Sequence, residues 1–170
     1  TGKGTSASHL SWTDDKFVEG EASIIEISGV YKKYHCPMAR TVLLGKPDQK
    51  KIDTMKRTRE ALQAGIDVTK PGNTADDVAQ AFWKVLDKYG IEKKSRTGYS
   101  IGIGYPPDWG EHTLNIQKGD KTILQKNVCF HMIAVMQFGE WGVESSESIR
   151  VSESGAENFY KFPDELHIKG

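Results

Sequence analysis

The chain has 170 residues and 37% of them are hydrophobic, which is enough for a single folded domain with its own core. Lys plus Arg and Asp plus Glu each total 23, and no basic stripe is interleaved with aromatic residues, so the composition argues against nucleic acid or a membrane as partner and favours a small-molecule substrate. No apolar run approaches the roughly 20 residues of a membrane-spanning helix, and the two cysteines, in hydrophobic contexts, are typical of reduced thiols in a cytoplasmic protein.

The first regular element predicted by the sequence is a β-hairpin. Residues 22–31 alternate apolar and polar side chains, a pair of lysines follows as an exposed turn, and residues 34–45 return with β-forming residues. Since side chains alternate across a strand, Glu26 is expected on the face opposite to its two isoleucine neighbours.

Two amphipathic helices are predicted after the hairpin. Apolar residues recur at helical spacing over residues 48–68, and the turn Lys-Pro-Gly follows at 70–72. Residues 73–77 then supply an N-cap and an acidic first turn to a second helix, which stops at Gly90.

The second half of the chain is predicted to form a long loop and a further hairpin. Residues 95–110 are rich in Gly and Pro, which indicates an irregular loop and a candidate wall of a site. Residues 127–137 form a dense apolar run, residues 142–151 are its expected antiparallel partner, and residues 159–170 are a short closing segment. This order predicts an α+β domain in which helices cover one face of an antiparallel sheet.

Three segments resemble the framework of the creatinase and methionine-aminopeptidase superfamily, whose fold is called pita-bread. They lie at residues 23–29, 34–41 and 98–102. The resemblance implies a curved antiparallel sheet and a single, partial pita-bread domain over 1–170. Members of the superfamily carry further helices before the segment that matches Thr1, so some surface of the sheet here is expected to lack its cover.

The resemblance also locates the metal-ligand positions of the metallopeptidase members. They correspond to Glu26, Pro37, Tyr99, Ile133 and Ser146. Only the first of these residues can bind a cation, and one carboxylate cannot hold a divalent ion that needs several oxygens. We therefore expect neither a metal nor another cofactor.

Further strings resemble one metal-independent branch of the superfamily, the ectoine hydrolases. They lie at residues 33–37, 94–99, 105–111, 119–120 and 130–132. The run Tyr-Pro-Pro-Asp-Trp-Gly-Glu at 105–111 is specific. The resemblance implies hydrolysis of a cyclic amidine, ectoine, to N-acetyl-2,4-diaminobutyrate, and a homodimer for the full-length protein.

Three residues are catalytic candidates under this resemblance. Glu26 occupies a former ligand position, where its carboxylate could pair with an amidinium, activate water or attack as a nucleophile; the alternative is a strand glutamate that faces solvent. His9 matches the place of the catalytic histidine of creatinase and suits proton transfer. Glu144 shares a strand face with the former ligand position Ser146, whereas Glu147 is expected on the opposite face.

Four residues are candidates for substrate binding. Trp109 could stack on a flat amidinium and Glu111 could accept its N–H groups, unless this segment is only a turn with an anchoring aromatic. Tyr99 offers a hydroxyl at a former ligand position. His131 could orient a substrate carboxylate or could be a core histidine bonded to backbone. Arg40 is expected to be architectural.

Two other functions remain open at this point. One is a related hydrolase of another small C–N substrate, such as a creatine-like amidine or a dipeptide. The other is a non-catalytic pita-bread module that binds peptides or proteins. Retention of His9, Glu26 and the string at 105–111 favours an enzyme, because a binding module needs no acid–base groups there.

Overall fold

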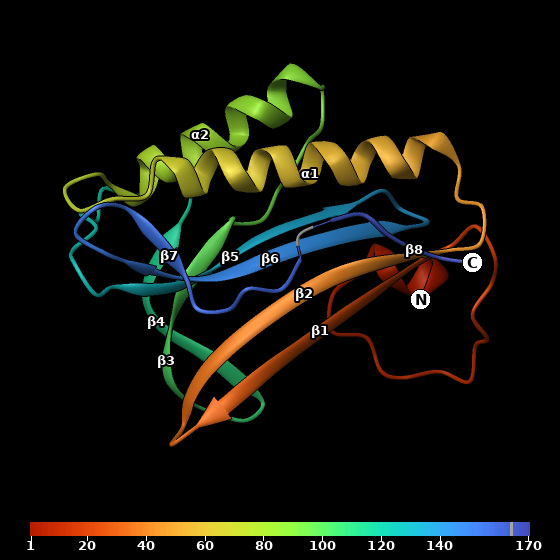
Figure 1. The fold of residues 1–170 in the computed structure, drawn as a ribbon, viewed down its shortest axis with the longest axis horizontal. Coiled ribbons are helices and arrows are strands. Elements are labelled where there is room, and N and C mark those ends of the chain that lie inside the picture. The colour runs from red at the N-terminus through yellow and green to blue at the C-terminus, as the bar shows by residue number, and fades with distance from the viewer. Residues whose placement is uncertain (164) are drawn as a thin grey trace.

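The computed structural model describes residues 1–163 and 165–170, and its centre is a curved sheet with two helices on one side (Figure 1). A short 3₁₀ helix, η1 (Gly2–Ser6), precedes a long hairpin of β1 (Ala22–Tyr31) and β2 (Tyr34–Leu44). The register of the hairpin is regular along its whole length. This confirms the predicted hairpin.

Both predicted helices are present. In α1 (Gln49–Asp67), the carboxylate of the N-cap residue Asp48 accepts a hydrogen bond from the backbone N–H of Lys51 at 2.8 Å. In α2 (Ala75–Lys88), Thr74 and Asp77 form a capping box, in which each side chain bonds the backbone N–H of the other residue. The two helices lie side by side over the same face of the sheet (Figure 1).

The remaining strands complete an eight-stranded sheet. They are β3 (Gly98–Tyr105), β4 (Asp108–Ile116), β5 (Cys129–Gln137), β6 (Gly142–Val151), β7 (Ala156–Asn158) and β8 (His167–Lys169). The order is β1-β2-β3-β5-β6-β7, with β4 beside β3 and β8 beside β2. The pairs described are antiparallel, except that β8 runs parallel to β2.

The prediction of an irregular loop over residues 95–110 is wrong, because β3 and β4 form a second hairpin there. The glycines that suggested a loop are used for close approach. A Cβ on Gly98 would lie 2.9 Å from the carbonyl oxygen of His131, and one on Gly102 would overlap the carboxylate of Glu111. The glycine content therefore reflects crowding between strands.

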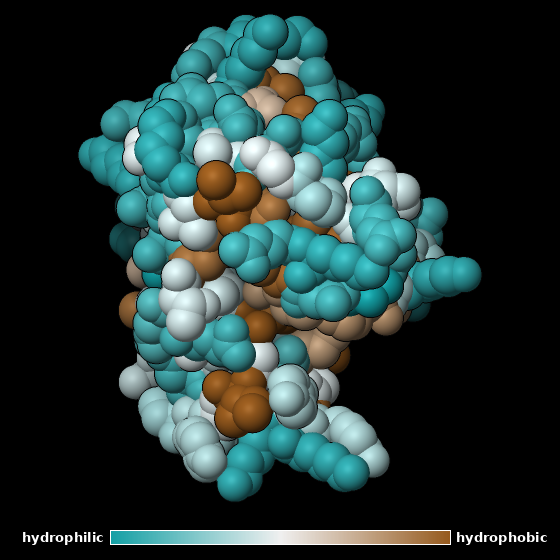
Figure 2. All heavy atoms as spheres, turned by 90° about the vertical axis from the view of Figure 1, so that its left-hand side faces the viewer, coloured by the Kyte–Doolittle hydropathy of each residue, from teal (hydrophilic) through white to brown (hydrophobic). Residues whose placement is uncertain are grey.

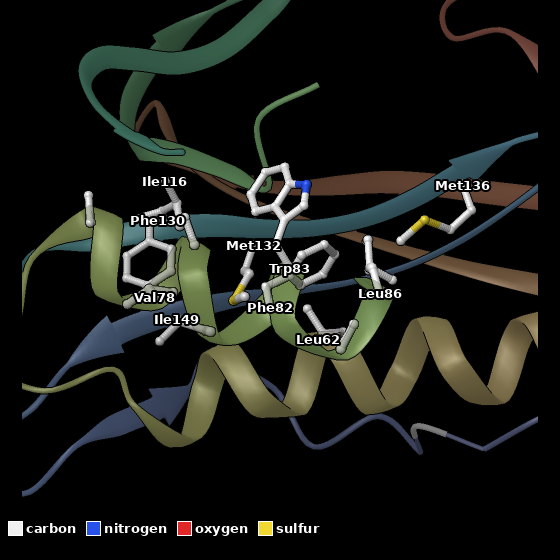
Figure 3. Packing of buried hydrophobic residues seen from close by; sticks show 14 of the residues in the cluster. Leu62, Val78, Phe82, Trp83, Leu86, Ile116, Phe130, Met132, Met136 and Ile149 are labelled. Atoms are coloured by element: carbon white, nitrogen blue, oxygen red, sulfur yellow. The ribbon is translucent and has the colours of Figure 1, made fainter. Parts of the chain in front are cut away.

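The hydrophobic core lies between the helices and one face of the sheet (Figure 3). Phe82 and Leu86 of α2 are fully buried, and so are Phe130 and Met132 of β5. Because side chains alternate along β5, the residues between these positions point to the other face of the sheet. That face carries the candidate site.

Side-chain hydrogen bonds join the first hairpin to β6. The hydroxyl of Thr41 donates to the carbonyl of Glu144 at 2.8 Å and accepts from its N–H at 2.7 Å. The backbone N–H of Ala39 donates to the hydroxyl of Ser146 at 2.7 Å, and Ser148 donates to the carbonyl of Pro37 at 2.6 Å. These bonds fix β2 relative to β6, and the pairing of β1 with β2 in turn positions Glu26.

The outer face of β1 is apolar and exposed. Ile25 and Ile27 are 55% and 56% exposed, and Tyr31 and Tyr34 at the end of the hairpin are also exposed. Figure 2 shows hydrophobic atoms in separate groups among hydrophilic ones on the side of the molecule that lies at the left of Figure 1. The exposed isoleucines give β1 an apolar outer strip. In the part of the chain that the structure describes, no helix has the length and hydrophobicity needed to cross a membrane.

Arg40 has the architectural position expected of it. Its guanidinium donates to the carbonyls of Ala39 and Ser146 at 2.9 and 2.7 Å and pairs with the Glu147 carboxylate at 2.5 Å. Both charged side chains are almost fully buried, 6% and 5% exposed. Glu147 thus faces away from the cavity that Glu144 lines, as the alternation of the strand predicts.

Replacing Glu147 by Gln is expected to lower the free energy of unfolding by about 3–5 kcal/mol, because it leaves a buried guanidinium without its counter-charge. Urea denaturation measures the change. Glu157→Gln is the matched control, since Glu157 pairs with Arg150 at the same 2.5 Å but both side chains are largely exposed. There we expect a loss of about 1 kcal/mol or less. Equal losses in the two variants would contradict this view of the buried pair.

Candidate active site

A cavity of about 1000 Å³ lies on the face of the sheet opposite to the helices. Odd-numbered residues of β5, such as Ile133, line it, whereas the even-numbered ones are in the core. Four of the predicted site residues line this cavity: His9, Glu26, Tyr99 and Glu144. The structure therefore brings together all three predicted catalytic side chains, which come from segments far apart in the sequence.

Glu26 and Glu144 form a pair of carboxyl groups with different environments. Burial raises the pKa of Glu26, and the nearby His9 lowers it again. Burial, followed by the charge of Glu26, raises the pKa of Glu144 to about 8, against the opposing effect of Lys93. With a pKa of about 8, Glu144 keeps its proton at neutral pH beside the carboxyl of Glu26, whose charge contributes to that shift, so one cavity holds a candidate base or nucleophile beside an acid.

His9 lies in the segment between η1 and β1. Its backbone has a φ of 57°, in the left-handed region that non-glycine residues rarely adopt, and its side chain is exposed to the cavity. His9 and Glu26 line the same cavity, and His9 lowers the pKa of the Glu26 carboxyl. This position is compatible with the predicted role in proton transfer.

Lys93 was missed by the sequence analysis. It is only 8% exposed, its Nζ donates to the hydroxyl of Ser95 at 2.5 Å, and its carbonyl accepts from the indole N–H of Trp83 at 3.3 Å. Burial lowers its pKa to about 8, and the carboxyl of Glu144 opposes the shift. In the sequence this lysine stands beside Lys94 among polar residues and has the pattern of a solvated surface.

Tyr99 is held by a chain of hydrogen bonds. The indole N–H of Trp109 donates to its hydroxyl at 2.6 Å, and that hydroxyl lies 3.0 Å from Nδ1 of His131. Nε2 of His131 lies 2.7 Å from the hydroxyl of Ser146, so both ring nitrogens of this histidine have a hydrogen-bond partner. Burial raises the pKa of Tyr99 to about 12 and lowers that of His131 to about 3, so both stay neutral.

Trp109 and His131 do not lie where the sequence analysis expected them. Neither is among the residues that line the cavity, and His131 is 0% exposed. His131 is a core histidine, bonded to side chains and not to backbone. Both residues lie behind Tyr99, so their predicted direct contact with substrate has no support in this geometry.

Glu111 lies elsewhere. It lines a second cavity of about 710 Å³ together with His35 and the two cysteines, Cys36 and Cys129, both of which are free thiols. The register of β3 against β4 shifts between Tyr99 and Ile101, and the Glu111 carboxylate packs against Gly102. The structure therefore separates Glu111 from the cavity of Glu26.

The residues at the former ligand positions do not fit a metal centre. Ile133 and Ser146, which the family resemblance assigns to two of these positions, are partners across β5 and β6. The hydroxyl of Ser146 already bonds Ala39 and His131. Within residues 1–163 and 165–170 no three His, Cys, Asp or Glu side chains are grouped so that they could hold a metal ion.

Comparisons with known proteins agree with the fold. The sequence matches metallopeptidase family M24 over residues 1–153. The ectoine hydrolase of Halomonas elongata is 45% identical over 170 residues, which cover 99% of this chain and 43% of that protein. Dipeptidase PepE from Mycobacterium ulcerans has a TM-score of 0.91 at 26% identity, covering 98% of this chain and 45% of that one.

A prolidase from Thermococcus sibiricus has a TM-score of 0.90 at 22% identity, with 98% of this chain and 45% of that one covered, and shows the fold alone. Together these likenesses confirm the pita-bread architecture that the sequence resemblance implied. The chain spans less than half the length of these relatives.

Proposed function

The chain belongs to metallopeptidase family M24, and from that premise we propose that it is part of a hydrolase that opens a small cyclic amidine, ectoine, without a metal ion. The observation that carries the proposal is the cavity in which Glu26 and Glu144 are paired, at a place where the other former ligand positions hold no metal-binding side chain. The 45% identity to an ectoine hydrolase supports the choice of substrate.

The paired carboxyl groups suit the reaction. Water adds across one C–N bond of the amidinium, the ring nitrogen leaves as an amine, and the amidine carbon becomes the carbonyl carbon of an acetamide. Glu26, as carboxylate, either attacks that carbon or removes a proton from the water that does so. Glu144, as carboxylic acid, supplies the proton that the departing nitrogen requires. His9 can return protons between solvent and Glu26.

A peptidase activity is less well supported, because peptide hydrolysis in this family depends on metal ligands that these residues do not supply. A homodimer and a cytoplasmic location for the longer protein are further parts of the proposal, which rest on the family resemblance.

Incubation of the full-length protein with ectoine is expected to give N-acetyl-2,4-diaminobutyrate, heavier than ectoine by one water, at a rate that preincubation with EDTA leaves unchanged. Mass spectrometry measures the product. Absence of product with ectoine would remove the ectoine assignment. Loss of activity after EDTA, restored by Mn, Co or Zn, would overturn the metal-free mechanism. An Xaa-Pro dipeptide in parallel tests the peptidase alternative.

A further inference from the structure

Arg96 is a basic residue in the wall of a cavity that also carries His9 and several acidic groups. Among the described residues that line the cavity, it is the only Lys or Arg, whereas Asp15, Glu26 and Glu144 are acidic. The sequence analysis assigned no role to Arg96.

The guanidinium of Arg96 is held in place without being neutralised. It lies 4.6 Å from the centroid of the Tyr99 ring, and one of its N–H groups donates to the side-chain oxygen of Asn115. Arg40 and Arg150 each pair with a glutamate. For Arg96, within the described part of the chain, no carboxylate lies at ion-pair distance.

An arginine so placed has N–H groups left for a ligand. A guanidinium has five N–H donors in a planar fork, and Asn115 accepts from one of its nitrogens. Stacking on Tyr99 and the bond to Asn115 fix the plane of the fork in advance, which reduces the entropy lost when it binds a second group. The partner that matches this geometry is a carboxylate, because it can accept two parallel N–H bonds.

Charges of both signs meet at one side chain of the cavity. The phenol of Tyr99 is under the influence of the carboxyl groups of Glu26 and Glu144 and, with opposite sign, of the guanidinium of Arg96. A ligand that lies against Tyr99 is therefore in a cavity whose lining includes both carboxyl groups, which can bind a cation, and a guanidinium, which can bind an anion. His131, which the sequence offered as the carboxylate-binding residue, is fully buried and cannot take that part.

We propose that Arg96 binds the carboxylate of the substrate, so that the cavity selects small zwitterions in which a carboxylate is attached to a cationic ring, over ring cations that lack it. This inference rests on the proposed function, since it names the class of substrate for the same site. Arg96 is a specificity residue in this scheme, whereas Glu26 and Glu144 act on the cationic ring.

The test compares two ligands on the full-length protein by titration calorimetry and by turnover. One ligand is ectoine, and the other is 2-methyl-1,4,5,6-tetrahydropyrimidine, the same ring without the carboxylate. The unmodified protein is expected to bind ectoine about 10- to 100-fold more tightly, the range for a charged hydrogen-bonded pair. Arg96→Met should remove this preference and leave the affinity for the ring without carboxylate unchanged, and Arg96→Lys should restore part of it.

The outcomes separate this inference from the proposed function. The role of Arg96 would be overturned if Arg96→Met lowered the affinity for both ligands equally or left the preference for ectoine unchanged. Failure of the unmodified protein to bind either ligand would overturn it as well. Discrimination by the unmodified protein that is lost in Arg96→Met, without any turnover of ectoine, would support Arg96 and overturn the hydrolase. Thermal unfolding of each variant shows whether a loss of binding is due to misfolding. If Arg96→Met misfolds, the preference for ectoine measured in Arg96→Lys decides whether Arg96 has the proposed role.

Discussion

Replacing Glu26 by Gln is expected to lower the turnover of ectoine by at least about 1,000-fold, because the amide can neither attack carbon nor accept a proton. The side chain lines the cavity from β1, which is paired along its whole length with β2, and Gln fits the same space. The fold is therefore expected to survive the change. Product formation at pH 7, measured by mass spectrometry on the full-length protein, gives the ratio of rates.

Glu153→Gln is the matched control, since this glutamate is 79% exposed and pairs with Lys126 at the surface. Its turnover should equal that of the unmodified protein. The two possible roles of Glu26 differ in one observable. A nucleophile forms a covalent adduct, visible as enzyme plus substrate in the intact mass after rapid acid quench, whereas a general base forms none. Full turnover by Glu26→Gln would remove Glu26 from the mechanism in either role.

The local signals in the sequence were sufficient for most of the fold. The lysine turn and the alternation over residues 22–31 located the first hairpin, and the cap signal at 73–77 located the start of α2. The same alternation predicted that Glu26 and its isoleucine neighbours lie on opposite faces, and both isoleucines are exposed. These features depend on residues close together in the chain, so periodicity is enough to recognise them.

The errors come from contacts between distant residues. Gly98 and Gly102 suggested a loop because their function, to admit the carbonyl of His131 and the side chain of Glu111, is visible only when the strands are assembled. Lys93 has no local mark that distinguishes it from a surface lysine, since its burial depends on packing around Trp83. Trp109 and Glu111 are close in sequence, yet the register shift in the second hairpin sends them to different places.

The site is organised in two layers. Tyr99 faces the cavity, and behind it Trp109, His131 and Ser146 form a fixed hydrogen-bonded chain. Two of these four residues, Tyr99 and Ser146, stand at former ligand positions. The sequence could indicate that metal ligands were absent. It could not indicate that Tyr99 and Ser146 are both hydrogen-bonded to His131, an arrangement that gives the cavity a fixed wall.

Activity is expected to fall above about pH 8, because the acid form of Glu144 is then lost. The pKa of this carboxyl is raised above its ordinary 4.5, so the proton is present through neutral pH and leaves as the pH rises through about 8. Glu144→Gln cannot supply that proton, and we expect it to lower kcat/KM by about 100- to 10,000-fold and to abolish the alkaline decline.

Lys93 also titrates near pH 8, so the alkaline decline alone does not identify Glu144. Lys93→Met separates the two groups. The positive charge of Lys93 lowers the pKa of Glu144, and its removal should therefore shift the decline in kcat/KM to higher pH. If Lys93 were itself the titrating acid, Lys93→Met would abolish the decline and Glu144→Gln would retain it. The direction in which the alkaline limb moves thus decides which of the two neighbouring groups holds the proton for the departing nitrogen.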